Sequence, residues 1–300
     1  MDNLKFNKGI FTLSLDTELA WGIIDKPFLL NKNKEYYFKT RNVIKEIINL
    51  LETYNISATW ALVGSLFLSE NELNIPFKKE DKSLWYGRDI LNWILDCNVD
   101  QEIGCHSFFH KLFSNENINE EIKRSIKEAK KWNLELRSFV FPRNLKGHLN
   151  ELKSYGFNSF RGVEQTWYVN YPKGLKKICH IIDQSFYITP PINLLEVECG
   201  LINIKGSMLY LPMNGFRKYI PLKSRIKKAY KGIDRCIEKK GIFHLWFHPF
   251  NIATNEEKLL FGLESIFQRV DEERKKGNLV IKNMGDIANM YEEVLGSKNV

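Results

Sequence analysis

The stretch IFTLSLDTE at residues 10–18 decides the fold class. Its apolar and β-branched residues are typical of a strand buried in a parallel sheet. The strand ends in Asp16, and Glu18 follows two residues later. Two carboxylates at the end of a buried strand are costly to bury unpaired, so the pattern predicts a cation beside them. One carboxylate would bind the cation, and the other would stay free as a general base.

Strand and helix patterns alternate along the rest of the chain. Between residues 162 and 215 the pattern loosens and prolines interrupt it, which predicts an irregular insertion of loops and short strands. Repeated strand–helix units indicate a mainly parallel α/β sheet, either closed into a barrel or doubly wound, within a single domain spanning residues 1–300. The expected strands are 56–63, 99–105, 138–141, 158–161, 242–247 and 279–281, and the expected helices are 36–54, 88–97, 118–132 (N-capped by Asn117), 149–155, 223–239, 256–275 and 284–294.

Composition favours a globular cytoplasmic protein. Hydrophobic residues make up 44% and charged residues 27% of the 300, which argues against disorder. Residues 1–8 lack the apolar core of a signal peptide, and no run approaches the roughly 18 apolar residues of a membrane span. The five cysteines are odd in number and form no CxxC pair, so we expect reduced thiols and no thiolate metal site.

Positive charge is concentrated in one segment. The net charge is +8, and residues 217–240 hold ten lysines and arginines against only Asp234 and Glu238. Such a segment can contact nucleic acid, anionic lipid or a phosphate-bearing substrate. A solvated helix face explains it equally well.

Further polar side chains follow other expected strands, and the ends of parallel strands gather in one place. In GCHSFFH, residues 104–110, two histidines four apart would lie on one side of a helical turn and face one ion. With one carboxylate they make a two-histidine, one-carboxylate set suited to zinc or another divalent first-row metal. The alternative is that both histidines are ordinary surface or core residues. Arg143 and His248 follow two later strands.

Five motifs together resemble a known family. SLDTE, ATWALVG, HSFFH, FVFPRN and WFHPF occur in the order found in the NodB-homology polysaccharide deacetylases, also called carbohydrate esterase family 4, and cover about residues 10–251. The resemblance implies a distorted (β/α) barrel with fewer than eight strand–helix units. It also implies a bound divalent metal, most often zinc.

The resemblance assigns roles to matching residues. His106 and His110 would be metal ligands, Asp16 the general base and His248 the general acid. The common family pattern has an aspartate ligand directly after the base, but Thr17 stands there, so the D-x-E variant of the motif places the carboxylate ligand at Glu18.

The third motif departs from the family. An arginine normally stands two residues before the proline and orients the base, but here Val140 precedes Pro142 and Arg143 follows it. Arg143 is the expected replacement. Arg161, otherwise a candidate substrate-binding residue, is one alternative, and the other is that neither arginine takes this role. Trp21, close behind the acidic pair, is the predicted sugar-stacking residue.

These features predict a metal-dependent deacetylase that removes an N-acetyl or other acyl group from a sugar, in surface polysaccharide or lipopolysaccharide synthesis. The substrate would be a sugar nucleotide, a lipid-linked sugar or an oligosaccharide. Segment 217–240 would contact the inner membrane face, and nucleic acid is disfavoured. The alternatives are a metal-independent hydrolase of cyclic amides on the same scaffold, and a non-catalytic protein that binds glycan or nucleic acid.

Overall fold

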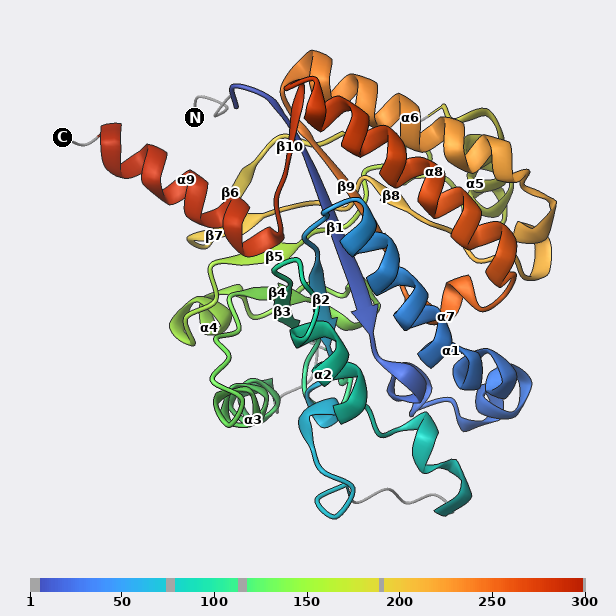
Figure 1. The fold of residues 1–300 in the computed structure, drawn as a ribbon, viewed down its shortest axis with the longest axis vertical. Coiled ribbons are helices and arrows are strands. Elements are labelled where there is room, and N and C mark those ends of the chain that lie inside the picture. Colours follow the sequence, from blue (N-terminus) through green and yellow to red (C-terminus); the bar gives the residue numbers. More distant parts are fainter. Residues whose placement is uncertain (1–5, 74–78, 113–117, 189–191, 299–300) are drawn as a thin grey trace.

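The computed structural model describes residues 6–73, 79–112, 118–188 and 192–298 (Figure 1). Asn117 lies outside the described residues. The strands are β1 (Gly9–Thr17), β2 (Thr59–Leu62), β3 (Glu102–Cys105), β4 (Ser138–Val140), β5 (Ser159–Arg161), β6 (Glu196–Glu198), β7 (Leu201–Asn203), β8 (Met208–Leu209), β9 (Ile242–Phe247) and β10 (Leu279–Ile281). The α-helices are α1 (Pro27–Thr53), α2 (Arg88–Leu95), α3 (Ile118–Lys130), α4 (Leu149–Ser154), α5 (Lys173–Phe186), α6 (Leu222–Lys239), α7 (Pro249–Ile252), α8 (Glu256–Lys275) and α9 (Met284–Lys298).

The strands form one sheet in the order β6-β7-β5-β4-β3-β2-β1-β9-β8, with β10 also paired to β1. Every pair of neighbours is parallel except β6 and β7. Helices α1, α6 and α8 cover the outer side near β1 and β9 (Figure 1). The predicted mainly parallel α/β sheet is confirmed.

A short connection draws the two ends of the sheet together. Strands β7 and β8 lie near opposite ends of the order, but only residues 204–207 separate them. Along this connection the Gly206 amide donates to the Gly162 carbonyl at 3.0 Å, and the Ser207 amide donates to the His244 carbonyl at 2.9 Å. The sheet therefore curls into a distorted barrel, as the family resemblance predicted, and brings β5 opposite β1.

The strand β1 divides its side chains between two environments, because successive residues point to opposite faces. Leu13 and Leu15 pack into the large outer core with the helices. Ile10 packs into a smaller inner cluster at the amino end of the barrel, where Met284 and Ile287 of α9 close the floor. Ser14 and Asp16 lie farther along the same inner face, toward the carboxyl end of the strand.

The helix and strand boundaries depart from expectation in two places. Helix α1 begins at Pro27 rather than residue 36, because Pro27 starts it and the polar residues 31–35 interrupt the apolar spacing between its first turn and the rest. The region 162–215 contains the expected short strands β6, β7 and β8, but also the helix α5. None of the helices, within the described residues, has the length and hydropathy of a membrane span.

Candidate active site

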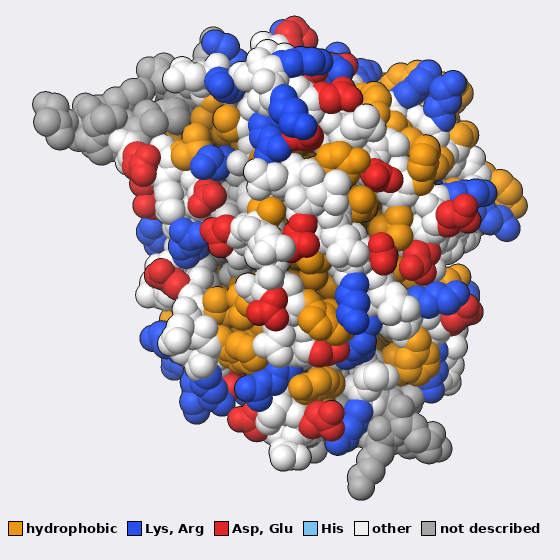
Figure 2. All heavy atoms as spheres, viewed as in Figure 1, with side chains coloured by type: hydrophobic (Ala, Val, Ile, Leu, Met, Phe, Trp, Pro, Cys, Tyr) orange, Lys and Arg blue, Asp and Glu red, His pale blue; other side chains and the backbone are white. Residues whose placement is uncertain are grey.

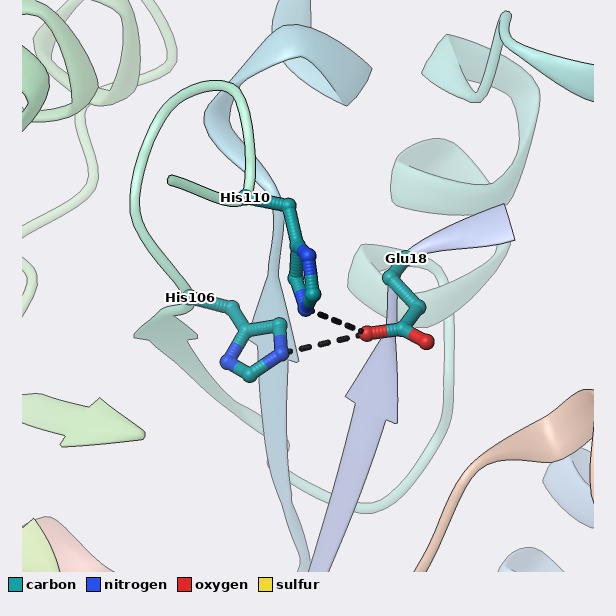
Figure 3. Close-up of side chains that lie close together, drawn as sticks. All are labelled: Glu18, His106 and His110. Atoms are coloured by element: carbon teal, nitrogen blue, oxygen red, sulfur yellow. Dashed lines mark hydrogen bonds and ion pairs between the residues drawn. The ribbon is translucent and has the colours of Figure 1, made fainter. Parts of the chain in front are cut away.

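Three side chains that offer metal-ligand atoms converge at the carboxyl end of the barrel (Figure 3). One oxygen of Glu18, which follows β1, lies 3.2 Å from Nε2 of His106 and 3.0 Å from Nε2 of His110. Their ligand atoms all lie within 4.8 Å of one another, and all three residues are buried. This donor set of one carboxylate and two imidazoles fits a divalent metal ion.

The two histidines reach this arrangement through a loop, not through the predicted helical turn. Ser107 and His110 both have positive φ, at 59° and 56°, so the chain after β3 doubles back on itself. The loop is fixed from behind by Glu121 of α3, whose carboxylate accepts the amide N–H groups of Phe108 at 3.0 Å and Phe109 at 2.7 Å. Sequence reasoning missed Glu121, because it lies among other acidic residues in a charged helix.

A backbone contact orients His106. Its Nδ1 lies 2.8 Å from the Val140 carbonyl oxygen, so Nδ1 carries the donated proton and Nε2 is left to face Glu18. A metal-binding histidine is commonly fixed in this way by a second hydrogen bond. The short strand β4 therefore orients a ligand held on β3.

Electrostatics keep Glu18 ionised. Burial alone would raise the pKa of its carboxyl, but the charges of His248 and His110 and the hydrogen bonds from both loop histidines hold it well below its usual value. For His106, burial lowers the pKa, yet the hydrogen bond to Glu18 and the nearby Asp16 charge raise it overall. The Glu18 carboxylate thus keeps a negative charge, which a cation can share.

The second carboxylate, Asp16, is bound by an arginine. Both guanidinium Nη atoms of Arg161, at the end of β5, donate to the two Asp16 oxygens, one of them at 2.6 Å, in a paired arrangement. Burial would raise the pKa of Asp16, but the Arg161 charge, then His248 and the Arg161 hydrogen bonds, lower it below its usual value. Asp16 is therefore an ionised carboxylate beside, but outside, the three-residue cluster.

Arg161 is itself held from three sides. Its guanidinium stacks on the Trp246 ring at 4.1 Å from the centroid, and one Nη donates to the Ser14 hydroxyl at 3.0 Å. His244 completes the support: its Nδ1 lies 3.1 Å from the Ile204 carbonyl, and its Nε2 lies 2.8 Å from the Ser14 oxygen. Burial, then the Arg161 charge, lowers the pKa of His244 to about 3, so this imidazole is neutral and accepts the Ser14 proton.

The expected orienting residue, Arg143, does not contact Asp16. It has a positive φ of 54° after β4, and its side chain pairs with Asp25 near the surface. Arg161, the alternative, pairs with Asp16 instead. The contributions of Ser14 and His244 were missed, although Ser14 and Asp16 alternate on β1, and His244 lies on β9 two residues before Trp246, in the way that inward-facing residues of a strand must.

His248 stands across from both carboxylates. Its Nε2 lies 3.6 Å from one oxygen of Asp16 and 3.6 Å from one oxygen of Glu18, and the side chain is 22% exposed. The ring lies between Trp246 and Phe250, with centroid distances of 6.1 Å and 5.0 Å. It is thus the one titratable group of this set that solvent or a substrate reaches readily.

Trp21 does not offer a stacking face. It is 2% exposed, and its indole N–H donates to the Trp85 carbonyl at 2.8 Å. The ring packs edge-on against Trp85 and beside Phe109. Trp21 therefore supports the site from below, contrary to the predicted role in sugar stacking.

A cavity of about 530 Å³ adjoins the arginine side of the site. Gly162 and Glu164 line it from the loop after β5, and Asn203 lines it from the end of β7. The Oδ1 atom of Asn203 is buried and has no hydrogen-bond partner among the described residues. Glu164 accepts the Trp246 indole N–H at 2.8 Å, so a single side chain separates this cavity from Arg161 and His248.

The fold matches those of known structures. Over 99% of this chain and 95% of the other, it superposes with a TM-score of 0.67 on a protein of Mycobacterium smegmatis assigned as a polysaccharide deacetylase, at 12% identity. The fold is that of the polysaccharide deacetylases. A second protein with this assignment, from Pseudomonas aeruginosa, gives a TM-score of 0.64 at 8% identity over 95% of this chain and 91% of the other.

The same fold also occurs in an enzyme with a different activity. The PuuE allantoinase gives a TM-score of 0.61 at 8% identity, over 95% of this chain and 90% of that one. No protein-family model matches the sequence, and no curated protein matches it. The likeness is therefore one of fold, and the chemistry has to be argued from the side chains.

Proposed function

We propose that this chain is a divergent NodB-homology enzyme, a metal-dependent deacetylase that hydrolyses an N-acetyl or other acyl group on a sugar. One observation carries the proposal: the buried Glu18, His106 and His110 cluster lies beside a separate ionised carboxylate, Asp16. A purely structural or ligand-binding protein has no need for a free base next to a metal-type donor set.

Each residue of the site has a distinct task. Glu18, His106 and His110 would hold the divalent ion, and their nitrogen and oxygen donors suit zinc. Such an ion, when bound, supplies a Lewis acid that acidifies water and polarises an acyl carbonyl. Asp16, kept ionised and oriented by Arg161, takes the proton of the attacking water.

The leaving group requires an acid, and His248 is placed to act as one. Its Nε2 lies 3.6 Å from one oxygen of Asp16 and 3.6 Å from one oxygen of Glu18, so it stands beside both the proposed base and the proposed ligand carboxylate. A protonated His248 delivers its proton to the departing nitrogen, releasing a carboxylic acid and a free amino sugar. Because His248 is partly exposed, it faces the side from which a substrate enters.

The surroundings favour a carbohydrate with a charged or lipid carrier. The cavity beside Arg161 is lined by polar side chains, among them Lys146, Asn203 and Lys205, which suit hydroxyl groups. We place the substrate among sugar nucleotides, lipid-linked sugars and oligosaccharides of surface polysaccharide or lipopolysaccharide synthesis. The enzyme would work in the cytoplasm, with the exposed cations of segment 217–240 facing the anionic inner membrane surface.

The decisive experiment measures acetate release from a panel of N-acetylated sugar nucleotides and lipid-linked oligosaccharides, with and without chelator. We expect release that chelation abolishes and zinc restores, and that Asp16→Asn removes while the bound metal is retained. Purified protein that keeps no divalent ion after dialysis, and releases acid from none of the panel, would show the proposal to be wrong.

A second candidate is hydrolysis of a cyclic amide without metal, favoured by the likeness to the allantoinase fold. It predicts ring opening by metal-free protein, and His106→Ala and His110→Ala variants that stay active. A third candidate is a non-catalytic binder of glycan or nucleic acid. It predicts tight, salt-sensitive DNA or glycan binding with no acid release.

A further inference from the structure

Helix α5 buries polar side chains and exposes apolar ones, which is the reverse of an ordinary surface helix. Its polar residues Asp183 and Gln184 are buried, at 0% and 3% exposed. Its outward side carries Leu175, Ile178, Ile182 and Phe186, with Ile178 at 56% and Phe186 at 68% exposed. We call these four residues the α5 stripe. Their spacing of three, four and four residues aligns them along one narrow line of the helix.

The inward side explains why α5 cannot rotate to hide this stripe. Lys228 of α6 donates to Asp183 at 2.6 Å in a fully buried ion pair, and the Trp167 indole N–H donates to the other Asp183 oxygen at 3.0 Å. His180 lies 2.8 Å from the Tyr168 hydroxyl. Rotating the helix would leave these buried polar groups without partners, which costs more than exposing apolar atoms.

More exposed apolar side chains extend the α5 stripe. Trp167 and Tyr171 precede the helix, and Phe216 and Tyr219 lie in a short 3₁₀ helix, η5 (Gly215–Tyr219). Both segments are tied to helix α6, because its Arg225 donates to the Arg217 carbonyl of η5 at 2.7 Å and its Lys228 donates to Asp183 of α5 at 2.6 Å. Monomeric soluble proteins rarely expose a contiguous apolar surface of this kind unless it binds something.

The charges around the α5 stripe indicate what it binds. Lys173 and Lys177 of α5 and Arg217 and Lys218 of η5 are exposed. Within residues 165–188 and 199–233 the only acidic residue is Asp183, which is buried and paired. The face that carries α1 and α8 is different, since acidic and basic side chains are intermixed there (Figure 2). Apolar side chains bordered by cations without anions match an anionic lipid surface.

We propose that the α5 stripe and η5 insert at the surface of an anionic lipid bilayer. The cavity beside Arg161 lies close to this face, because the exposed residues Val163 and Val169 line it and flank Trp167 in the sequence. Glu196 and Glu198 also line this cavity, and that part of its lining stays outside the membrane contact. A lipid-linked sugar would enter from the membrane. This last step rests on the proposed deacetylase function, whereas the membrane contact does not.

The structure also revises how the basic segment contributes. Arg225 is buried and donates to backbone carbonyl groups, including that of Arg217 at 2.7 Å, and Lys228 is used by Asp183. These two cations hold α6, η5 and α5 together and cannot face lipid. The positive charge at the surface comes instead from exposed cations, which are Lys173 and Lys177 of α5 and Arg217 and Lys218 of η5.

The test is sedimentation of the full chain with vesicles of phosphatidylcholine, with and without phosphatidylglycerol. We expect binding that requires the anionic lipid and weakens with salt. A triple variant, Ile178→Gln, Ile182→Gln and Phe186→Gln, should bind at least about tenfold more weakly, because three apolar side chains no longer enter the bilayer. The matched control, Phe38→Gln with Phe261→Gln on α1 and α8, removes exposed aromatics elsewhere and should bind like the parent.

Two further measurements keep the outcomes distinct. Thermal unfolding should be nearly unchanged in the triple variant, since the replaced side chains are exposed. Acid release from a water-soluble substrate should also be unchanged, because none of these residues touches the site. Vesicle binding without hydrolysis would sink the deacetylase proposal alone. A parent protein that ignores anionic vesicles, or dimerises through this stripe instead, would overturn the membrane proposal.

Discussion

The candidate site has two halves, and the sequence alone predicts one of them much better than the other. One half consists of Glu18, His106 and His110. These residues belong to two short motifs at the ends of β1 and β3, and only β2 separates these strands in the sheet. The Asp16 and Arg161 half spans the barrel, because Arg161 reaches Asp16 from the opposite strand β5. The first half was predicted from residue types and order. The second depended on which strands face each other across the interior.

The difference also concerns function. The first half provides donor atoms, so a lost residue should remove the cofactor. The second half provides the ionisation and direction of a base, so a lost residue should leave the cofactor and damage the reaction. Comparing the metal content and the activity of variants in the two halves therefore tests whether the halves have these separate roles.

The largest effect is expected from the histidines. His110→Ala removes one of three ligand atoms, so the bound divalent metal should be lost on dialysis. Activity should fall by on the order of 10³-fold or more, because the ion accounts for several kcal/mol of transition-state stabilisation. Metal analysis and acid release check this. His148→Asn, at a half-buried position with positive φ, is the control and should retain both.

Next comes the arginine pair. Arg161→Ala should lower kcat by about 100-fold or more while the metal content stays at the parent level, because the base loses its only bidentate partner. Arg143→Ala should change kcat by less than about threefold, since Arg143 pairs with Asp25 near the surface. A larger loss of kcat in Arg143→Ala than in Arg161→Ala would show that Arg143, not Arg161, orients Asp16.

The pH profile separates ionisation from orientation. Arg161→Gln removes the charge that lowers the pKa of Asp16, so burial then dominates and the pKa rises. Because Asp16 acts only when ionised, activity is lost as pH falls through this pKa, and the acid limb of the profile should move to higher pH. An acid limb that stays in place would mean that Asp16 is not the group titrated.

The smallest expected effect comes from a pair of glycines. A Cβ atom at Gly22 would lie 2.0 Å from an oxygen of Glu18, so Gly22→Ala must displace that carboxylate. Metal affinity should fall by about 10- to 100-fold, the usual cost of disturbing the support of a ligand. A Cβ at Gly162 would meet Asn203 at 2.1 Å, in the other half. Gly162→Ala should leave metal affinity unchanged, and competition with a chelating dye measures both.

Much of the fold was accessible from the sequence. The run at residues 10–18 is a strand, His106 follows β3 and His248 follows β9, because apolar β-branched runs and the residues that end them are local signals. The loop geometry was not accessible, since positive φ at Ser107 and His110 depends on Glu121 binding the loop from α3. Arg161 ends a three-residue strand, too short to show that it faces β1.

Helix α5 shows a second limit. Its pattern reads as amphipathic in either orientation, and an apolar side normally marks the core. Here Asp183 and Lys228, 45 residues apart, pair with each other and reverse that orientation. Partners so distant in the chain leave no periodic signature, so the helix was taken for part of an irregular insertion.

Helix α9 would affect the proposed reaction without contacting the site. Met284 and Ile287 fill the amino end of the barrel, and the amides of Met284 and Gly285 donate to Thr59 and Glu102. Shortening the chain before residue 284 would let water rise through the interior toward Asp16, where a dry environment strengthens its bond to Arg161. Helix α9 thus closes the amino end of the barrel, and we expect its removal to lower the activity of the proposed active site although the helix does not contact that site.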